Sequence, residues 1–183
     1  FMMEPGKVLS TFKAKNGSSV VLRTPDMHDL SDMLKFINDL VAEKAMIATS
    51  RKQTLESEAD YLSGIISSNI KGNAVHIVAE VNGHMIGKGE VTRGSDESRH
   101  TGTLGISLAK NYRSIGIGTA LVKELLKQAK RLGIKLVYLE VFANNVHAQN
   151  LYKKMGFKIT GALPKKLRYG GKYVDAVLMA KKL

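Results

Sequence analysis

Residues 104–132 constrain the fold of this chain most, because the spacing of their apolar side chains changes within a few residues. In residues 104–108 leucine and isoleucine alternate with small or polar residues, which predicts a strand with one buried face. After a turn that contains Gly116 and Gly118, apolar residues recur at helical spacing as far as Leu132, with lysines on the other face. A strand that leads through a glycine-rich turn into an amphipathic helix predicts an α/β layer structure.

The rest of the chain divides into strands and helices of the same kinds. Asn-Gly pairs at 16–17 and 82–83 lie between alternating segments, and this dipeptide favours the tight turns of hairpins. Thr54 and Gly72 have the properties of a helix cap and a helix stop. The expected strands cover residues 7–15, 19–24, 75–81, 85–91, 104–108, 136–142, 157–163 and 173–180. The last two are joined by an expected loop at 164–172, and residues 145–155 form an expected short helix.

Length and composition fit one domain without metal or disulfide. The chain has 183 residues, which is about the size of one domain, and we expect residues 1–183 to form it. Cysteine is absent, so disulfides and thiolate metal sites are excluded. The five histidines lack the spacing of a metal motif, and we expect no metal. Among them, His76 alternates with apolar residues, which predicts a solvent-facing side chain on a strand.

The net charge of +12 favours an anionic partner, such as a phosphorylated cofactor, nucleic acid or the ribosome, although it also suits a merely soluble protein. The basic residues are spread along the chain, and no basic strand carries the interleaved aromatic residues of a nucleic-acid-binding face. We therefore expect no nucleic-acid partner. No apolar stretch approaches the roughly 20 residues that span a bilayer, and the first residues lack the features of a signal peptide. We expect a cytoplasmic protein without a membrane partner.

The turn between residue 108 and the following helix has the properties of a phosphate site. The first N–H groups of a helix have no partner within the helix and attract phosphate oxygens. Glycines at 116 and 118 leave room for a pyrophosphate beside the backbone, and Arg113 adds a cation. A dinucleotide fingerprint would need glycine where the chain has Leu121, and a Walker A loop would need lysine where it has Thr119.

Two motifs resemble those of one enzyme superfamily. The pattern Arg-x-x-Gly-x-Gly at 113–118 resembles acetyl-CoA-binding motif A of the GNAT superfamily of N-acetyltransferases. A second segment resembles motif B of that superfamily, in which the matching residues are Asn145, Ala148, Leu151, Tyr152, Gly156 and Phe157. The resemblance covers about residues 75–183, and the end of the chain is similar to ribosomal-protein-alanine and small-molecule amine acetyltransferases.

The resemblance implies a fold and an activity. The fold is a mixed, mostly antiparallel sheet of six to seven strands flanked by about four helices, with a V-shaped splay between parallel strands 104–108 and 136–142. The activity is transfer of the acetyl group of acetyl-CoA, a co-substrate, to a primary amine of a protein N-terminus, an amino acid or another small amine. No metal is implied, and homodimers are common in the superfamily. The alternative is a CoA-binding regulatory or ribosome-associated module that has this fold and no turnover.

The resemblance also implies roles for particular residues. Backbone groups of Ile106 and Leu108 would hold the pantetheine arm and polarise the thioester, and the Asn145 amide would bind the same arm. The pyrophosphate would lie against residues 113–119, namely Arg113, Ser114, Ile115, Gly116, Ile117, Gly118 and Thr119. We place the residues that select the acceptor in segments 44–53 and 164–172.

Two residues are expected to move protons. Tyr152 matches the superfamily's tyrosine acid near the CoA sulfur, although a tyrosine there also suits simple packing. Glu140 lies within an apolar run and is the candidate base, either directly or through water. Its alternative is an ion pair with a lysine on the outer face of the sheet. Glu90, on a neighbouring strand, is the reserve base.

Overall fold

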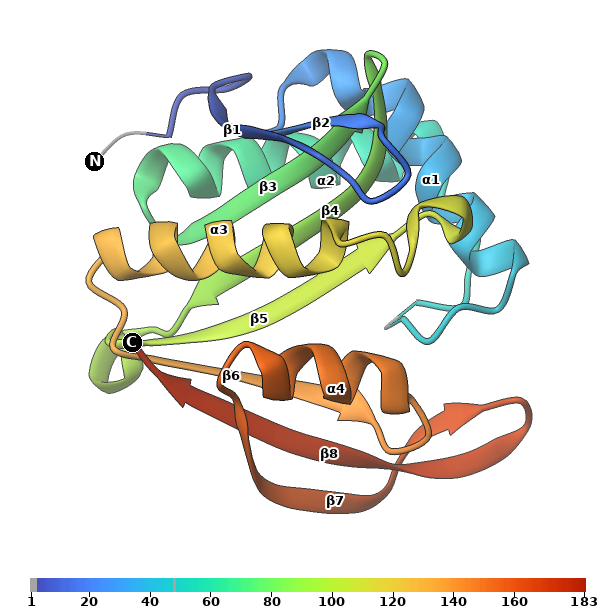
Figure 1. The fold of residues 1–183 in the computed structure, drawn as a ribbon, viewed down its shortest axis with the longest axis vertical. Coiled ribbons are helices and arrows are strands. Elements are labelled where there is room, and N and C mark those ends of the chain that lie inside the picture. The colour runs from blue at the N-terminus through green and yellow to red at the C-terminus, as the bar shows by residue number, and fades with distance from the viewer. Residues whose placement is uncertain (1–2, 48) are drawn as a thin grey trace.

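A computed structural model of the protein describes residues 3–47 and 49–183. Within these residues eight strands form one sheet in the order β1-β2-β3-β4-β5-β6-β8-β7 (Figure 1). This is the number of strands that the spacing predicts and one more than the six to seven that the resemblance implies. Every neighbouring pair is antiparallel except β5 with β6. The strands are β1 Val8–Lys13, β2 Ser19–Arg23, β3 Ala74–Val81, β4 His84–Arg93, β5 Thr101–Leu108, β6 Leu136–Phe142, β7 Lys158–Tyr169 and β8 Lys172–Lys182.

Helices cover both faces of the sheet. The α-helices are α1 Leu30–Ala42, α2 Leu55–Lys71, α3 Ile117–Arg131 and α4 Val146–Lys154. Helices α1 and α2 pack behind β3 and β4 in Figure 1, and α3 and α4 lie in front, so the sheet separates two apolar clusters. The predicted Thr54 cap and Gly72 stop are confirmed, since Thr54 and Ser57 form a capping box and Gly72 is left-handed. None of the helices in the described ranges is long and apolar enough to cross a membrane.

The sheet opens between its two parallel strands, as predicted. Strands β5 and β6 pair only over residues 101–103 and 136–138. Beyond that point β5 stays paired with β4 as far as Leu108, while β6 stays paired with β8 as far as Phe142. The two strands therefore diverge into a V, and Figure 1 shows the N-terminal ends of α3 and α4 at its wide end.

The predicted loop at 164–172 is wrong. Strand β7 continues to Tyr169, and only Gly170 and Gly171, both with positive φ, turn the chain into β8. Register shifts interrupt the pairing near Lys165, whose N–H bonds to the Asp175 carboxylate at 2.8 Å. Proline and lysines predicted a loop, but an edge strand with a bulge accommodates both residue types.

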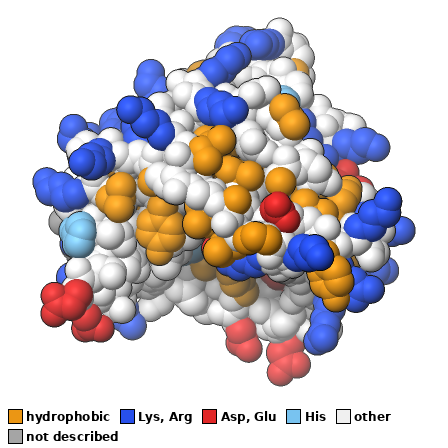
Figure 2. Space-filling model, turned by 90° about the horizontal axis from the view of Figure 1, so that it is seen from below, with side chains coloured by type: hydrophobic (Ala, Val, Ile, Leu, Met, Phe, Trp, Pro, Cys, Tyr) orange, Lys and Arg blue, Asp and Glu red, His pale blue; other side chains and the backbone are white. Residues whose placement is uncertain are grey.

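The face nearest β7 combines an apolar centre with a basic surround. Figure 2 shows hydrophobic side chains near the middle of this face and many Lys and Arg side chains around them. The large apolar residues of β6, β7 and β8 that remain exposed are Tyr138, Ile159, Leu163 and Tyr173. On the face that Figure 2 shows, Lys and Arg side chains border the apolar area at the top and on both sides, and Asp and Glu side chains lie along the lower edge.

Candidate active site

The backbone of β5 presents unpaired groups to the V. The Thr101 carbonyl accepts a bond from the end of β4, and the Ala109 N–H donates to β4. Successive residues of a strand point their backbone groups to opposite sides, so the groups of Ile106 and Leu108 point toward β6, where pairing has ended. The Leu108 carbonyl accepts a 2.9 Å bond from Nε of Arg113. Both predicted backbone positions thus lie in the opening, with the Leu108 N–H as a donor.

The N-terminus of α3 forms a cradle of N–H groups. Gly116 is the N-cap and has no side-chain cap. The N–H groups of residues 114–119 donate to no acceptor among the described residues. Ser114 and Gly116 are both left-handed, with φ of 64° and 94°, and left-handed residues among right-handed ones turn successive N–H groups toward one point. This geometry fits the pyrophosphate of CoA.

The two glycines of this turn have different structural reasons. Gly116 has a φ of +94°, which side chains rarely adopt, and a Cβ there would meet only Lys15 Cγ at 4.0 Å. At Gly118 the φ is ordinary, but a Cβ would lie 3.0 Å from Leu151 Cδ1. Gly118 therefore has a structural reason of its own, since it allows α3 to approach α4, and its role beside a pyrophosphate stays a prediction.

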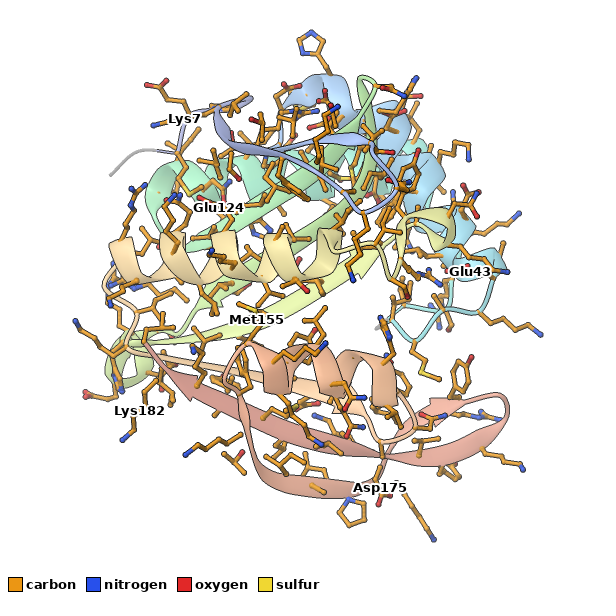
Figure 3. The ribbon with its side chains drawn as sticks, viewed as in Figure 1. Lys7, Glu43, Glu124, Met155, Asp175 and Lys182 are labelled. Atoms are coloured by element: carbon orange, nitrogen blue, oxygen red, sulfur yellow. The ribbon has the colours of Figure 1, made fainter. Side chains whose placement is uncertain are left out.

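Arg113 is bound within the protein. Its guanidinium forms an ion pair with Glu43, the residue that caps the C-terminal end of α1, in addition to the Nε bond to Leu108. Figure 3 labels Glu43 beside the segment that joins β5 to α3. In this arrangement Arg113 ties that segment to α1, and its contact with the cofactor stays a prediction.

Lys15 is a basic residue at the cradle that the sequence did not indicate. The N–H of Lys15, in the β1–β2 turn, donates to the Ile115 carbonyl at 3.0 Å. Its side chain lies closest to the position of a Cβ on Gly116. No local pattern predicts this contact, because the hairpin and the turn are far apart in the sequence.

Asn145 caps α4. Its side-chain oxygen accepts a 3.1 Å bond from the Ala148 N–H, which is the usual task of asparagine at a helix start. The amide oxygen is therefore engaged, and the contact of Asn145 with pantetheine stays a prediction.

Tyr152 lies on α4 and is buried. Its ring packs edge to face on Phe157, with the centroids 5.7 Å apart. Its hydroxyl has no hydrogen bond with any described residue. Burial raises the pKa of Tyr152, and the Glu90 carboxylate raises it further, because a nearby negative charge disfavours a phenolate. The phenol therefore stays protonated at neutral pH and can donate a proton.

Glu90 lies on β4 directly opposite Gly105 of β5. A Cβ on Gly105 would be 3.2 Å from Oε1 of Glu90, so the missing side chain makes room for the carboxylate. Burial raises the pKa of Glu90, and Lys88 partly offsets the rise. The negative charge of Glu90 raises the pKa of Tyr61 on α2 and that of Tyr152 on α4. The Glu90 carboxylate is therefore within electrostatic reach of helices on both faces of the sheet.

His76 lies opposite Glu90 on β3, and its predicted exposure is wrong. Its side chain is buried under α2, where Asn69 bonds to both backbone groups of His76. Burial lowers the pKa of His76 to about 4, with a smaller effect from Lys88. The imidazole is thus neutral at physiological pH. Simple alternation failed here because both faces of this central strand are covered.

Glu140 lies on β6 and forms an ion pair with Lys166 of β7. This is the predicted alternative to a catalytic role, and the role itself stays a prediction. Continuing the register of Thr103 and Tyr138 by two residues places Gly105 and Glu140 at the same level. Glu90 and Glu140 therefore approach the V from its two sides on one face of the sheet.

A group of charged residues on β4 and α2 was not predicted. The Lys88 ammonium donates to the Tyr61 hydroxyl at 2.7 Å and lies 4.1 Å from the centre of the Tyr61 ring. Glu58, on α2, is buried, and its Oε1 has no hydrogen-bond partner within residues 3–47 and 49–183. Burial raises the pKa of Glu58, and Lys88 opposes this. The available signal was the alternation of Lys88 and Glu90 with glycines on an otherwise apolar strand.

Comparison with known proteins identifies the family. A family model described as Acetyltransferase (GNAT) family matches residues 38–157. An N-alpha-acetyltransferase of Sulfurisphaera tokodaii is 37% identical over 117 residues, which cover 58% of this chain and 68% of that protein. An L-amino acid N-acetyltransferase of Escherichia coli is 34% identical over 83 residues, which cover 45% of this chain and 51% of that one. The structure of a ribosomal-protein-alanine N-acetyltransferase from Brucella melitensis is 27% identical, with a TM-score of 0.79 over 88% of this chain and 99% of that one.

The chain belongs to the GNAT family of acetyltransferases. The prediction of an acetyl-CoA-dependent N-acetyltransferase with an amine acceptor is confirmed at this level. The three relatives are named for different acceptors, so membership of the family leaves the acceptor of this chain open.

Proposed function

We propose that the V between β5 and β6 is the site of acetyl transfer from acetyl-CoA to a primary amine. The observation that carries this proposal is that the wide end of the V holds two sets of unpaired backbone groups: those of Ile106 with the Leu108 N–H, and the N–H cradle at 114–119. Such a pair of sites suits a ligand with an amide-rich arm at one end and a pyrophosphate at the other. In this proposal Lys15 supplies positive charge near the phosphates, Arg113 anchors the turn through Glu43, and the Leu108 N–H is available to the thioester oxygen.

Glu90 is the base that we favour over Glu140. A general base works best when its pKa lies near the operating pH, and burial raises the pKa of Glu90. Tyr152 is within the electrostatic reach of Glu90, which supports a shared site for the two. Glu140 would first have to leave Lys166, with which it pairs at the surface. The two carboxylates nevertheless share one face of the sheet, so a direct test is needed.

In the proposed reaction, Glu90 accepts a proton from the acceptor's ammonium group. The freed nitrogen lone pair forms a C–N bond with the acetyl carbonyl carbon, and the C–S bond breaks. The Leu108 N–H stabilises the oxygen as charge develops on it. Tyr152 donates its proton to the leaving sulfur. The nitrogen of the new amide still carries a second proton, which passes through solvent to the Tyr152 phenolate. Glu90 releases its own proton to solvent, so both groups are restored.

The proposal is tested by matched substitutions of the two carboxylates. A panel of amines and peptides is assayed for acetyl-CoA-dependent release of free CoA. With the best acceptor, Glu90→Gln is expected to lower kcat/KM by roughly 10²–10⁴-fold, whereas Glu140→Gln changes it little. The loss in Glu90→Gln should shrink as rising pH deprotonates the amine without help. The reverse pattern would assign the base to Glu140, and full activity in both variants would remove carboxylate catalysis from the proposal.

For the partners and the location we propose a homodimer that acts in the cytoplasm. The apolar centre of the face in Figure 2 supports self-association. Light scattering at several concentrations tests the dimer, and fractionation of the source cells tests the location.

A further inference from the structure

Lys88 and Glu90 form a pair of opposite charges beside the proposed site of transfer. Both side chains lie on the face of β4 that α2 covers, opposite Ser107 and Gly105 of β5. Alternate residues of a strand are roughly 7 Å apart along the strand. Since β5 and β6 diverge toward Leu108, Lys88 lies nearer the wide end of the V and Glu90 deeper within it.

The ammonium of Lys88 has donors available for a ligand. Its partner is the Tyr61 hydroxyl, and Lys88 forms no ion pair with any residue of the described ranges. The Tyr61 ring holds the ammonium in place from α2. Lys88 and Tyr61 are both partly exposed, whereas Glu58 is closed off from solvent. A ligand that enters the V therefore meets the Lys88 charge before it reaches Glu90.

We propose that the acceptor is a free α-amino acid, with its ammonium group at Glu90 and its carboxylate at Lys88. This inference rests on the proposed function, since it assigns the acceptor of the same site. In an α-amino acid the two charged groups are two bonds apart. With a charge-assisted hydrogen bond of about 2.8 Å at each end, the molecule can bridge two side chains that leave the same face of a strand roughly 7 Å apart, as Lys88 and Glu90 do.

The same charges disfavour the other amine classes. A diamine would place its second ammonium group beside Lys88, where like charges repel. A peptide N-terminus carries a neutral amide where the amino acid has its carboxylate, so Lys88 would gain only a weaker bond. The zwitterion alone matches both charges of the pair.

The experiment compares free L-α-amino acids with the corresponding amides as acceptors in the CoA-release assay. For the preferred side chain, the parent protein is expected to show a kcat/KM about 10- to 150-fold higher for the acid than for the amide. Lys88→Met should remove most of this ratio, and Lys88→Arg should keep much of it. The ratio is the readout, because loss of the Lys88 charge also affects Glu90 and thereby both substrates. Lys71→Met, at the exposed end of α2, is the matched control and should behave as the parent does.

The outcomes separate this inference from the proposed function. If the parent acetylates amides or peptides as well as the free acid, or if Lys88→Met lowers both rates equally, the amino-acid assignment is overturned while acetyl transfer stands. If no amine is acetylated, the proposed function fails, and calorimetric titration of amino acids into the CoA-saturated protein decides the inference. Binding that is lost in Lys88→Met alone would support the subsite, and absence of binding to the parent would refute it.

Discussion

Replacement of Tyr152 by phenylalanine separates a catalytic phenol from a packing residue. The ring contact with Phe157 is kept, and the hydroxyl has no hydrogen bond to lose among the described residues. A lost hydrogen bond would cost about 0.5–1.5 kcal/mol, and for a protein of this size 1 kcal/mol shifts the melting temperature by roughly 2–4 °C. Because that loss is absent, Tyr152→Phe is expected to change the melting temperature by less than about 2 °C.

The kinetic effect of the same substitution is expected to be large. The pKa of Tyr152 is raised by burial and by Glu90, so the phenol is protonated at working pH. If its proton goes to the leaving sulfur, the lost interaction exists mainly in the transition state. Turnover, kcat, should then fall by roughly 10²–10⁴-fold, while the affinity for acetyl-CoA stays the same.

Stopped assays of CoA release give kcat, and calorimetry gives the affinity. Tyr173→Phe makes the same chemical change at an exposed site on β8 and serves as the control. Turnover at the parent rate in Tyr152→Phe would refute the acid role. Loss of affinity and melting temperature together would instead show that Tyr152 acts through packing.

Three further predictions follow from contacts near the site. Gly118→Ala should lower the melting temperature because the new methyl group displaces Leu151, and adding Leu151→Ala should restore part of the loss. Gly116→Ala should destabilise the fold by about 1–2 kcal/mol through its left-handed φ, whether or not Leu151 is replaced. Because burial raises the pKa values of Glu58 and Glu90, the folded state binds their protons more tightly than the unfolded state does. This contribution to stability is fully present below their ordinary pKa and is lost as the pH rises through their pKa in the folded state. Glu58→Gln should therefore gain unfolding free energy relative to the parent as the pH rises above the ordinary pKa of a glutamate, measured in urea titrations. Arg113→Ala and Glu43→Gln should each weaken CoA binding by roughly tenfold, and the double variant should lose little more; additive losses would contradict the anchoring of the turn by this pair.

Local patterns were sufficient to predict most of the elements and the glycine-rich start of α3, whose role in phosphate binding stays a prediction. Alternation and helical spacing depend on neighbours within a few residues, and so do the Thr54 cap and the left-handed Gly116. The splay between β5 and β6 was expected from the resemblance and not from spacing, and the structure confirms it through the short pairing at 101–103. The loop at 164–172 was mispredicted because polar composition marks exposure, which an edge strand shares with a loop.

Contacts between distant segments account for what the sequence did not reveal. Leu151 leaves no room for a side chain at position 118. The N–H of Lys15, in the first hairpin, donates to the Ile115 carbonyl. Neither partner lies within the range of a local pattern. Glu140 attracted attention because it interrupts an apolar run, but its β6 face is exposed and Lys166 pairs with it. Glu90, between glycines on β4, gave a weaker signal although it is the more buried carboxylate.

The register of the sheet explains why Glu90 is suited to its proposed task. His76, Glu90 and Gly105 occupy one row across β3, β4 and β5. The neutral His76 adds no charge to this row, and Gly105 contributes no side chain, so the Glu90 carboxylate is flanked by groups that neither neutralise nor displace it. A half-buried carboxylate without an ion-pair partner is unfavourable for stability, yet the same setting raises its proton affinity toward the range a base needs. Lys88 limits that rise from two residues away, where it remains available to a ligand. A direct Lys88–Glu90 ion pair would stabilise the fold more, but neither charge would then be available to the acceptor. Their separation along the strand therefore matters for acetyl transfer.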